Sequence, residues 1–234
     1  MISSFYHRKS KFDRKEDSLT ATIFDLLKYL PSEIFWNILR NSLYHRKLPK
    51  YAGEIQSISF WEKWSVKDKD ELNSNYIEPD VFIRFEDFDL IIEAKRYDLK
   101  QQCKGQLKSQ INAYYLNFEK DSKTLYYIQL GGLLDFKDES YPHSNRSKKE
   151  GKLIMILKTD WSRILSQVVR EKDRLAQLDY QPINAYVRIL EDLIKGFELH
   201  GFYKKSWFED LEINFDPSTI SDKVAIYDAS RRHG

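Results

Sequence analysis

Cysteine is almost absent from this sequence of 234 residues, because Cys103 is the only one. That scarcity excludes an internal disulfide and a zinc site built from cysteine thiolates. Apolar runs are short, and none approaches the roughly 20 residues that a transmembrane helix needs. Residues 1–17 also lack the apolar centre of a signal peptide. We therefore expect a cytoplasmic protein with no membrane partner.

The sequence also lacks motifs for ATP binding and for metal binding by histidine. There is no glycine-rich phosphate loop, so ATP-driven activity is not expected. None of the 5 histidines has a metal-binding spacing such as His-Glu-x-x-His. The chain also lacks internal repeats, low-complexity tracts and long flexible linkers. We expect a single domain over residues 1–234.

The residues that are present describe a globular protein with a real core. Hydrophobic residues make up 41% of the chain and charged residues 32%. The net charge is only +2, but residues 1–50 hold ten Lys or Arg against five Asp or Glu. A local basic surface of this kind suits a phosphate backbone, although a solvated face of mixed charge explains it equally well.

Hydrophobic periodicity predicts alternating helices and strands. Helices are expected over residues 16–30, 32–44, 99–118, 160–171 and 182–200. Strands are expected over residues 55–64, 81–85, 90–94, 124–130 and 152–157. The polar stretch 135–151 is expected to be a surface loop. This order predicts an α/β fold with a mixed central sheet flanked by helices, and an additional C-terminal helical part within residues 152–234.

Three charged residues stand out for their positions on two of these strands. Asp80 begins one strand, and Glu93 and Lys95 end the next. Because side chains alternate along a strand, Glu93 and Lys95 point to the same face. If the turn centres on Glu86 and Asp87, the hairpin places Asp80 directly opposite Glu93. A three-residue loop would shift that register.

Opposed carboxylates favour a divalent cation between them. Directly opposite residues have Cβ atoms about 5 Å apart, where like charges destabilise a sheet. Magnesium takes oxygen ligands and keeps waters and substrate phosphate in its shell. We therefore expect Asp80 and Glu93 to bind Mg²⁺, with Mn²⁺ as a substitute, and Lys95 to orient the attacking water. The alternative is a charged pair at a strand end that faces solvent.

The segment around these residues resembles the PD-(D/E)xK nuclease superfamily. Asp80 stands in the Pro-Asp half of the motif, and Glu93, Ala94 and Lys95 form the second half. The resemblance covers about residues 12–132 and implies a restriction-endonuclease-like αβββαβ core. It also implies that Asp80 and Glu93 bind the metal, that the backbone carbonyl of Ala94 adds a ligand, and that Lys95 assists the water.

The resemblance also implies an acid from the first helix. Glu16 is the best match, Asp17 is second, and Glu54 is a weaker rival for the same role. Glu16 would then be a metal ligand. The alternative is a carboxylate stabilised at a helix N-terminus by the macrodipole.

The helix after Lys95 resembles the RecB nuclease branch, which often carries Gln-x-x-x-Tyr. Gln110 and Tyr114 fit that spacing, and residues four apart share a helix face. Gln106, Gln110 and Tyr114 could therefore all look into the site, with Gln110 as the catalytic candidate. The alternative is an amphipathic helix whose polar residues flank its core stripe.

Several other charged residues have ordinary explanations beside functional ones. A ridge of cations on the same helix could follow a DNA backbone or simply solvate an exposed face: Lys100, Lys104 and Lys108. Arg84 could contact phosphate or pair with Glu86. His200 lies near a helix C-terminus, where a cation is stabilised.

These observations predict a Mg²⁺-dependent nuclease that hydrolyses DNA phosphodiester bonds. One alternative is a catalytically silent module that keeps the nuclease fold to bind nucleic acid or a partner. Another is a nuclease for RNA or branched DNA, on which the same residues would do the same chemistry. The resemblance implies bacterial phage defence, restriction or repair as settings, with DNA as partner and a homodimer or a second protein of such a system as further partners.

Overall fold

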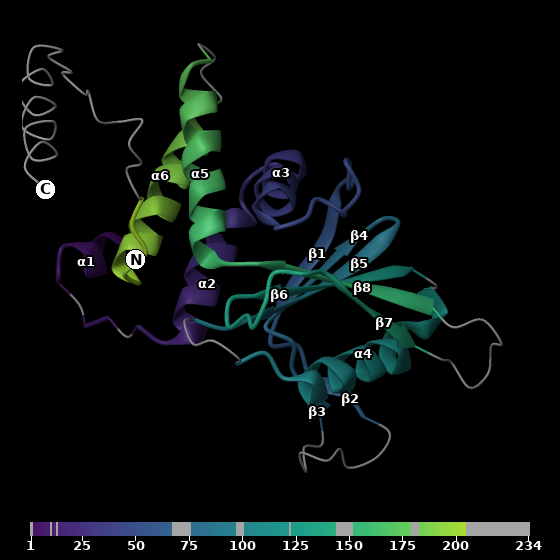
Figure 1. Ribbon diagram of the computed structural model, residues 1–234. Coiled ribbons are helices and arrows are strands. Elements are labelled where there is room, and N and C mark those ends of the chain that lie inside the picture. The colour runs from purple at the N-terminus through teal and green to yellow at the C-terminus, as the bar shows by residue number, and fades with distance from the viewer. Residues whose placement is uncertain are drawn as a thin grey trace, which may run out of the picture. The chain divides into compact units, whose positions relative to one another are not determined.

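A six-stranded sheet forms the centre of the computed structural model (Figure 1). The structure describes residues 2–9, 11–12, 14–66, 76–96, 101–121, 123–143, 152–178 and 183–204. In spatial order the strands are β1 (Ile55–Phe60), β4 (Val81–Phe85), β5 (Phe88–Ala94), β6 (Thr124–Leu130), β8 (Lys152–Thr159) and β7 (Glu139–His143). β5, β6 and β8 are parallel, and the other pairings are antiparallel. The sheet is therefore mixed, as predicted.

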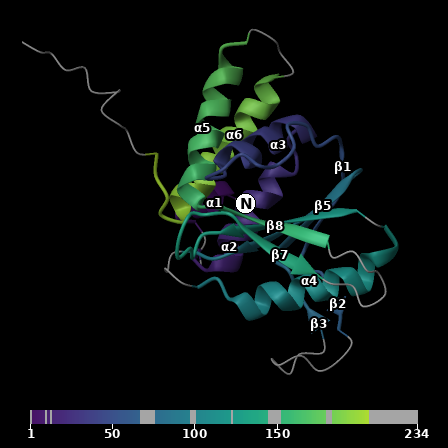
Figure 2. The same ribbon diagram turned by 45° about the vertical axis from the view of Figure 1, so that its right-hand side comes forward.

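Helices cover both faces of this sheet (Figure 2). They are α1 (Ile2–Tyr6), α2 (Glu16–Leu27), α3 (Ser32–Ser42), α4 (Lys104–Phe118), α5 (Trp161–Ala176) and α6 (Ile183–Leu199), with a 3₁₀ turn at Glu119–Asp121. α2, α3, α5 and α6 pack on one face. α4 covers the other face, together with a small sheet of β2 (Trp64–Ser65) and β3 (Tyr76–Ile77).

Strand alternation divides the core into these two layers. On β4, Val81 and Ile83 enter the layer with α2 and α5, whereas Phe82 enters the layer with α4. Every residue of β5 is buried, which explains its nearly continuous apolar sequence. A central strand of this kind holds its C-terminal residues in fixed positions.

The α/β class and the predicted order of helix, three strands, helix and strand are confirmed. α5 also begins as predicted, because Asp160 caps it by accepting a hydrogen bond from the backbone amide of Arg163 at 2.9 Å. In the part of the chain that the structure describes, no helix has the length and apolarity required to cross a membrane. Predictions for residues 205–234 lie outside the described part.

The predicted strand 55–64 is wrong at its end, because Trp61 interrupts it. Trp61 has a φ of 48°, in the left-handed region that a large side chain rarely adopts. β1 therefore stops at Phe60, and Trp64 belongs to the separate small sheet. The apolar pattern alone carried no sign of this turn.

The predicted loop 135–151 is also wrong in part, since it contains β7. This edge strand pairs antiparallel with β8. Its sequence is polar and includes Pro142, and proline is tolerated on an edge strand because it has no amide to donate. Most of the pattern that identifies a strand is therefore missing.

The predicted helix 99–118 starts later than expected, at Lys104. The backbone amide of Gln101 donates to the carbonyl of Gly132 at 3.1 Å instead of continuing the helix toward the N-terminus. Residues 97–100 lie outside the described part, as does Pro182, the predicted start of the last helix. Other boundaries differ by a few residues.

Candidate active site

The hairpin of β4 and β5 has the register that the sequence predicts. Val81 lies opposite Ile92, and Arg84 lies opposite Asp89. The same register extends to Asp80, just before β4, and to Glu93 near the end of β5. The two carboxylates therefore lie at neighbouring positions, on the face that α4 covers.

Asp80 is held from two sides. Its Oδ2 accepts from the backbone amide of Ala94 at 2.8 Å, and its Oδ1 accepts from the indole Nε1 of Trp61 at 3.2 Å. Burial and the nearby charge of Glu93 raise the pKa of Asp80 to about 7, although the Ala94 amide opposes the shift. The turn at Trp61, where the backbone is strained, thus supplies a donor to the site.

Glu93 is almost completely buried, with 1% of its surface exposed. Two amides of α4 donate to it: Gln110 Nε2 at 2.6 Å and Gln106 Nε2 at 2.7 Å. The hydroxyl of Tyr127 donates to Gln110 Oε1 at 2.6 Å, which directs the NH₂ group of Gln110 toward Glu93. Gln106 and Gln110 therefore both reach the predicted site.

The ammonium group of Lys95 contacts most of the predicted metal ligands. Its Nζ contacts the Glu93 carboxylate, Glu16 Oε1 at 3.3 Å and the backbone carbonyl of Ala94 at 3.0 Å. Burial lowers the pKa of Lys95, but the charge of Glu93 and its hydrogen bond outweigh this and leave the pKa above its ordinary value. Three groups predicted to bind a metal thus surround one ammonium group.

Glu16 is the first residue of α2 and reaches the end of β5. Its Oε2 accepts from the backbone amide of Arg96 at 3.0 Å, while Oε1 contacts Lys95. Glu54, its weaker rival, lies elsewhere and accepts from the hydroxyl of Ser32 at 2.6 Å. Asp17 is exposed on α2. Of the three candidate acids, Glu16 contacts the other site residues.

The backbone around Lys95 is packed closely. The Lys95 amide donates to Leu130 O at 2.7 Å, and its carbonyl accepts from Trp161 Nε1 at 2.9 Å. Gly131 lies so close that an added Cβ would be 2.1 Å from the Lys95 carbonyl oxygen. Gln102 donates to the carbonyls of Glu93 and Gly131 at 3.2 and 3.1 Å. These contacts fix the end of β5.

Sequence reasoning missed several of these supporting residues: Trp61, Arg96, Gln102, Tyr127 and Trp161. None carries a motif, because each contacts the site from a segment distant in sequence or from an irregular stretch. The Gly131-Gly132 pair, by contrast, marks the end of β6 in the sequence. Two successive glycines are a signal of close approach between the backbone and another segment, here Lys95.

Two predicted site residues belong to another polar cluster at the opposite end of β5. Tyr114 donates its hydroxyl to Asp89 at 2.9 Å, so the prediction that it faces the site is wrong. Arg84 donates to Asp89 at 3.2 Å and pairs with Asp121, rather than with Glu86. Residues four positions apart share a helix face but lie about 6 Å apart along the helix axis. Gln110 therefore reaches Glu93, whereas Tyr114 reaches Asp89.

The remaining charged candidates do not contact the proposed site residues in the hydrogen bonds described above. Lys104 and Lys108 are exposed on α4, and Lys100 lies outside the described part. His200 is buried, and burial together with the charge of Arg96 lowers its pKa to about 4. The prediction of a stabilised His200 cation is therefore wrong, because desolvation outweighs the helix terminus.

The donor chemistry of the site fits a hard cation. Carboxylate and carbonyl oxygens come from Asp80, Glu93, Glu16 and Ala94, the ligand type that Mg²⁺ takes. Among the described residues, however, no three or more Asp, Glu, His or Cys side chains are grouped closely enough to hold a metal by themselves. The Lys95 ammonium already contacts three of the four donors.

Comparison with curated proteins shows a relative of this chain. The chain is 31% identical over 215 residues to the uncharacterized protein PM0110 of Pasteurella multocida (strain Pm70), an alignment that covers 85% of this chain and 75% of the relative. No protein-family model matches the chain. No solved structure matches it either. The chain therefore belongs to the same family as this Pasteurella multocida protein.

Proposed function

We propose that this protein is a Mg²⁺-dependent deoxyribonuclease of the PD-(D/E)xK superfamily. The observation that carries the proposal is the convergence of Glu16, Glu93 and the Ala94 carbonyl on Lys95 Nζ, with Asp80 beside them. These are the residues that the motif predicts, and they come from two segments far apart in sequence.

The electrostatics of the acids support a cation. Asp80 and Glu93 repel each other in a poorly solvated site, which raises the pKa of Asp80 to about 7 through burial and the charge of Glu93. A divalent cation would stabilise both ionised carboxylates where a single ammonium does so only partly. Keeping both carboxylates ionised in this site is therefore unfavourable in free energy unless a cation of higher charge is bound.

Each residue has a distinct role in the proposed reaction. A bound magnesium ion supplies Lewis-acid polarisation of the phosphoryl oxygens. Asp80, Glu93, the Ala94 carbonyl and Glu16 would hold it. Lys95, released from these oxygens, would orient the attacking water and offset the negative charge that develops on the phosphate. Gln110 keeps Glu93 in position through its hydrogen bond of 2.6 Å.

Plasmid cleavage tests the proposal. Purified wild type, Asp80→Ala and Lys95→Ala are incubated with supercoiled plasmid and Mg²⁺, with Lys195→Ala as a matched control on the exposed side of α6. We expect nicking or linearisation by wild type and Lys195→Ala, with at least about a hundredfold loss in the other two. Equal cleavage by all four proteins would show a contaminating nuclease and overturn the assignment.

A catalytically silent module is the rival, and one observation favours it. The ammonium of Lys95 satisfies the carboxylates that it contacts, as a purely structural ion-pair network would. Isothermal titration with Mn²⁺ separates the two: a nuclease requires saturable binding that Asp80→Ala abolishes. Absence of binding to the wild type would favour the structural network.

A further inference from the structure

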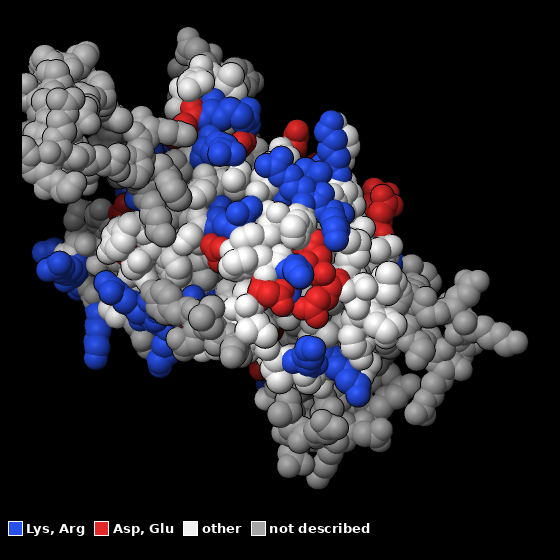
Figure 3. Space-filling view, viewed as in Figure 1, with Lys and Arg blue, Asp and Glu red and all other residues white. Residues whose placement is uncertain are grey.

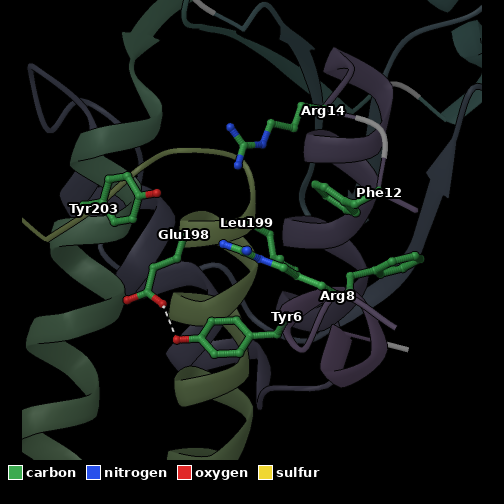
Figure 4. A pocket seen from close by; sticks show the side chains of 8 residues that line it. Tyr6, Arg8, Phe12, Arg14, Glu198, Leu199 and Tyr203 are labelled. Carbon is green, nitrogen blue, oxygen red and sulfur yellow. Dashed lines mark hydrogen bonds between the residues drawn. The ribbon is translucent and has the colours of Figure 1, made fainter. Parts of the chain in front are cut away.

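A cavity of about 400 Å³ has a lining that combines cations with aromatic rings (Figure 4). It is formed by α1, the segment that leads into α2, and the C-terminal end of α6. A volume in this range accommodates a ligand of small-molecule size. The proposed metal site accounts for none of its lining residues.

Two arginines give the cavity its charge. Arg8 and Arg14 both line it, and both are exposed. No acidic residue in the described ranges forms an ion pair with either guanidinium. Glu198, the single lining acid, accepts a hydrogen bond from Tyr6 at 3.2 Å. Guanidinium groups with free donors bind phosphate in bidentate fashion.

Aromatic rings supply the other half of the lining. Phe12 packs against Phe5 at a centroid distance of 5.2 Å and against buried His200 at 4.7 Å, so its position is fixed. Tyr203 is 63% exposed and Tyr6 is 45% exposed. Exposed rings beside cations are the usual means of binding a nucleotide of a single strand, because every base has a face that can stack.

Two observations indicate that the cavity is near the proposed active site. Arg14 lies two residues before Glu16, which limits their Cα separation to about 7 Å. Arg96, whose amide donates to Glu16, also donates from its side chain to the His200 carbonyl at 2.8 Å. A strand whose scissile phosphate lies at Lys95 could therefore place a nearby nucleotide in the cavity.

We propose that this cavity binds one unstacked nucleotide of single-stranded DNA, with its phosphate on Arg8 and Arg14 and its base against the aromatic rings. The proposal rests on the proposed nuclease function and names its substrate class, DNA that is single-stranded next to the cleaved bond. A base inside a duplex would first have to leave its stack, which costs free energy.

Binding without catalysis tests the cavity directly. Fluorescence anisotropy in EDTA compares a 5′-phosphorylated, fluorescein-labelled oligothymidylate with a blunt hairpin duplex. The variants are the double change Arg8→Gln with Arg14→Gln, the single change Phe12→Leu, and Arg188→Gln as a control on the exposed side of α6. Thermal unfolding by circular dichroism identifies any variant that fails to fold.

We expect the double arginine variant to bind the single strand about tenfold more weakly, and Phe12→Leu about fivefold, with a change below twofold for Arg188→Gln. Affinity for the blunt duplex should change much less. Unchanged single-strand affinity in folded variants, or an equal loss for both substrates, would overturn the inference. Displacement of the strand by micromolar thymidine monophosphate would overturn it too, because it would indicate a free-nucleotide site.

The outcomes for the cavity and for the nuclease are separable. If wild type cleaves no DNA but single-strand binding depends on the arginines, the proposed function fails and the cavity assignment stands. If cleavage depends on Lys95 while binding ignores the arginines, the cavity assignment fails and the nuclease stands.

Discussion

At the scale of single residues, Glu16 connects the N-terminal helix to the end of the central strand. Its two carboxylate oxygens contact the Lys95 ammonium and the Arg96 amide, so one side chain links α2 to the segment after β5. A glutamine at this position can still accept the hydrogen bond from the Arg96 amide, but it has no negative charge to bind a cation. The two functions of this carboxylate can therefore be separated.

Glu16→Gln is expected to lower nuclease activity by about ten- to a hundredfold with little change in thermal stability. Glu54→Gln is the matched control, since Glu54 was the rival candidate and instead contacts Ser32. Initial rates of plasmid nicking at saturating Mg²⁺ provide the measurement. If the two variants are equally active, Glu16 has no role in metal binding.

The pH dependence of metal binding follows from Asp80. Burial and the charge of Glu93 raise the pKa of Asp80 to about 7, so below this pH a cation must displace a proton. Mn²⁺ affinity should therefore rise about tenfold per unit up to pH 7 and level off above it. Titration calorimetry at pH 6, 7 and 8 tests this, and a flat profile would contradict it.

The free energy of unfolding is a less sensitive measure of the Asp80 protonation state than metal binding is. Without metal, the folded protein keeps a proton on Asp80 that the unfolded chain releases above about pH 4, so this residue makes stability fall as pH rises toward 7. His200, whose pKa burial and Arg96 lower to about 4, acts in the opposite direction between about pH 4 and 6.5. The two contributions partly cancel.

At the scale of elements, the close contact between β6 and the end of β5 depends on a glycine. Gly131 has a φ of 71°, and an added Cβ would lie 2.1 Å from Lys95 O. Gly53 has a φ of 70° but an added Cβ there would meet nothing within 4 Å. The two positions share the backbone conformation and differ in the clash.

Gly131→Ala is expected to destabilise the fold by about 2–5 kcal/mol, from left-handed strain plus overpacking. Gly53→Ala has only the strain and should cost about 1–2 kcal/mol. Urea denaturation followed by circular dichroism compares them. Equal destabilisation of the two variants would mean that the chain moves away from Lys95 at no cost.

The hairpin could be predicted from sequence because its determinants are local. A two-residue turn and an apolar pattern on each strand set the register that brings Asp80 opposite Glu93. Glu16 could be assigned only through the resemblance to a family. Trp61 and Trp161 could not be assigned at all, since their contacts depend on a left-handed turn and on a helix that follows β8.

At the scale of the whole molecule, positive and negative charges nearly balance, with 38 Lys or Arg against 36 Asp or Glu. On the face shown in Figure 3, Lys and Arg side chains lie in separate groups with acidic and uncharged surface between them. On this face, cations in separate groups would contact few successive phosphates at once.

DNA binding should therefore depend only moderately on salt. Each neutralised phosphate of duplex DNA contributes about −0.9 to the slope of log affinity against log salt concentration. We expect a slope smaller in magnitude than about 4, measured by anisotropy in EDTA from about 50 to 300 mM KCl. A steeper slope would mean that a larger basic surface contacts DNA than this face displays.

The contact between Trp161 and the Lys95 carbonyl has a consequence for biosynthesis. The site draws on Glu16, on the end of β5, and on α5, and α2 packs into the core layer that includes α6. Such long-range contacts form late in folding, because loops must close before they contribute. A nascent chain on the ribosome therefore carries the motif long before it has a working site. The proposed DNA cleavage would then begin only when synthesis of the core is complete.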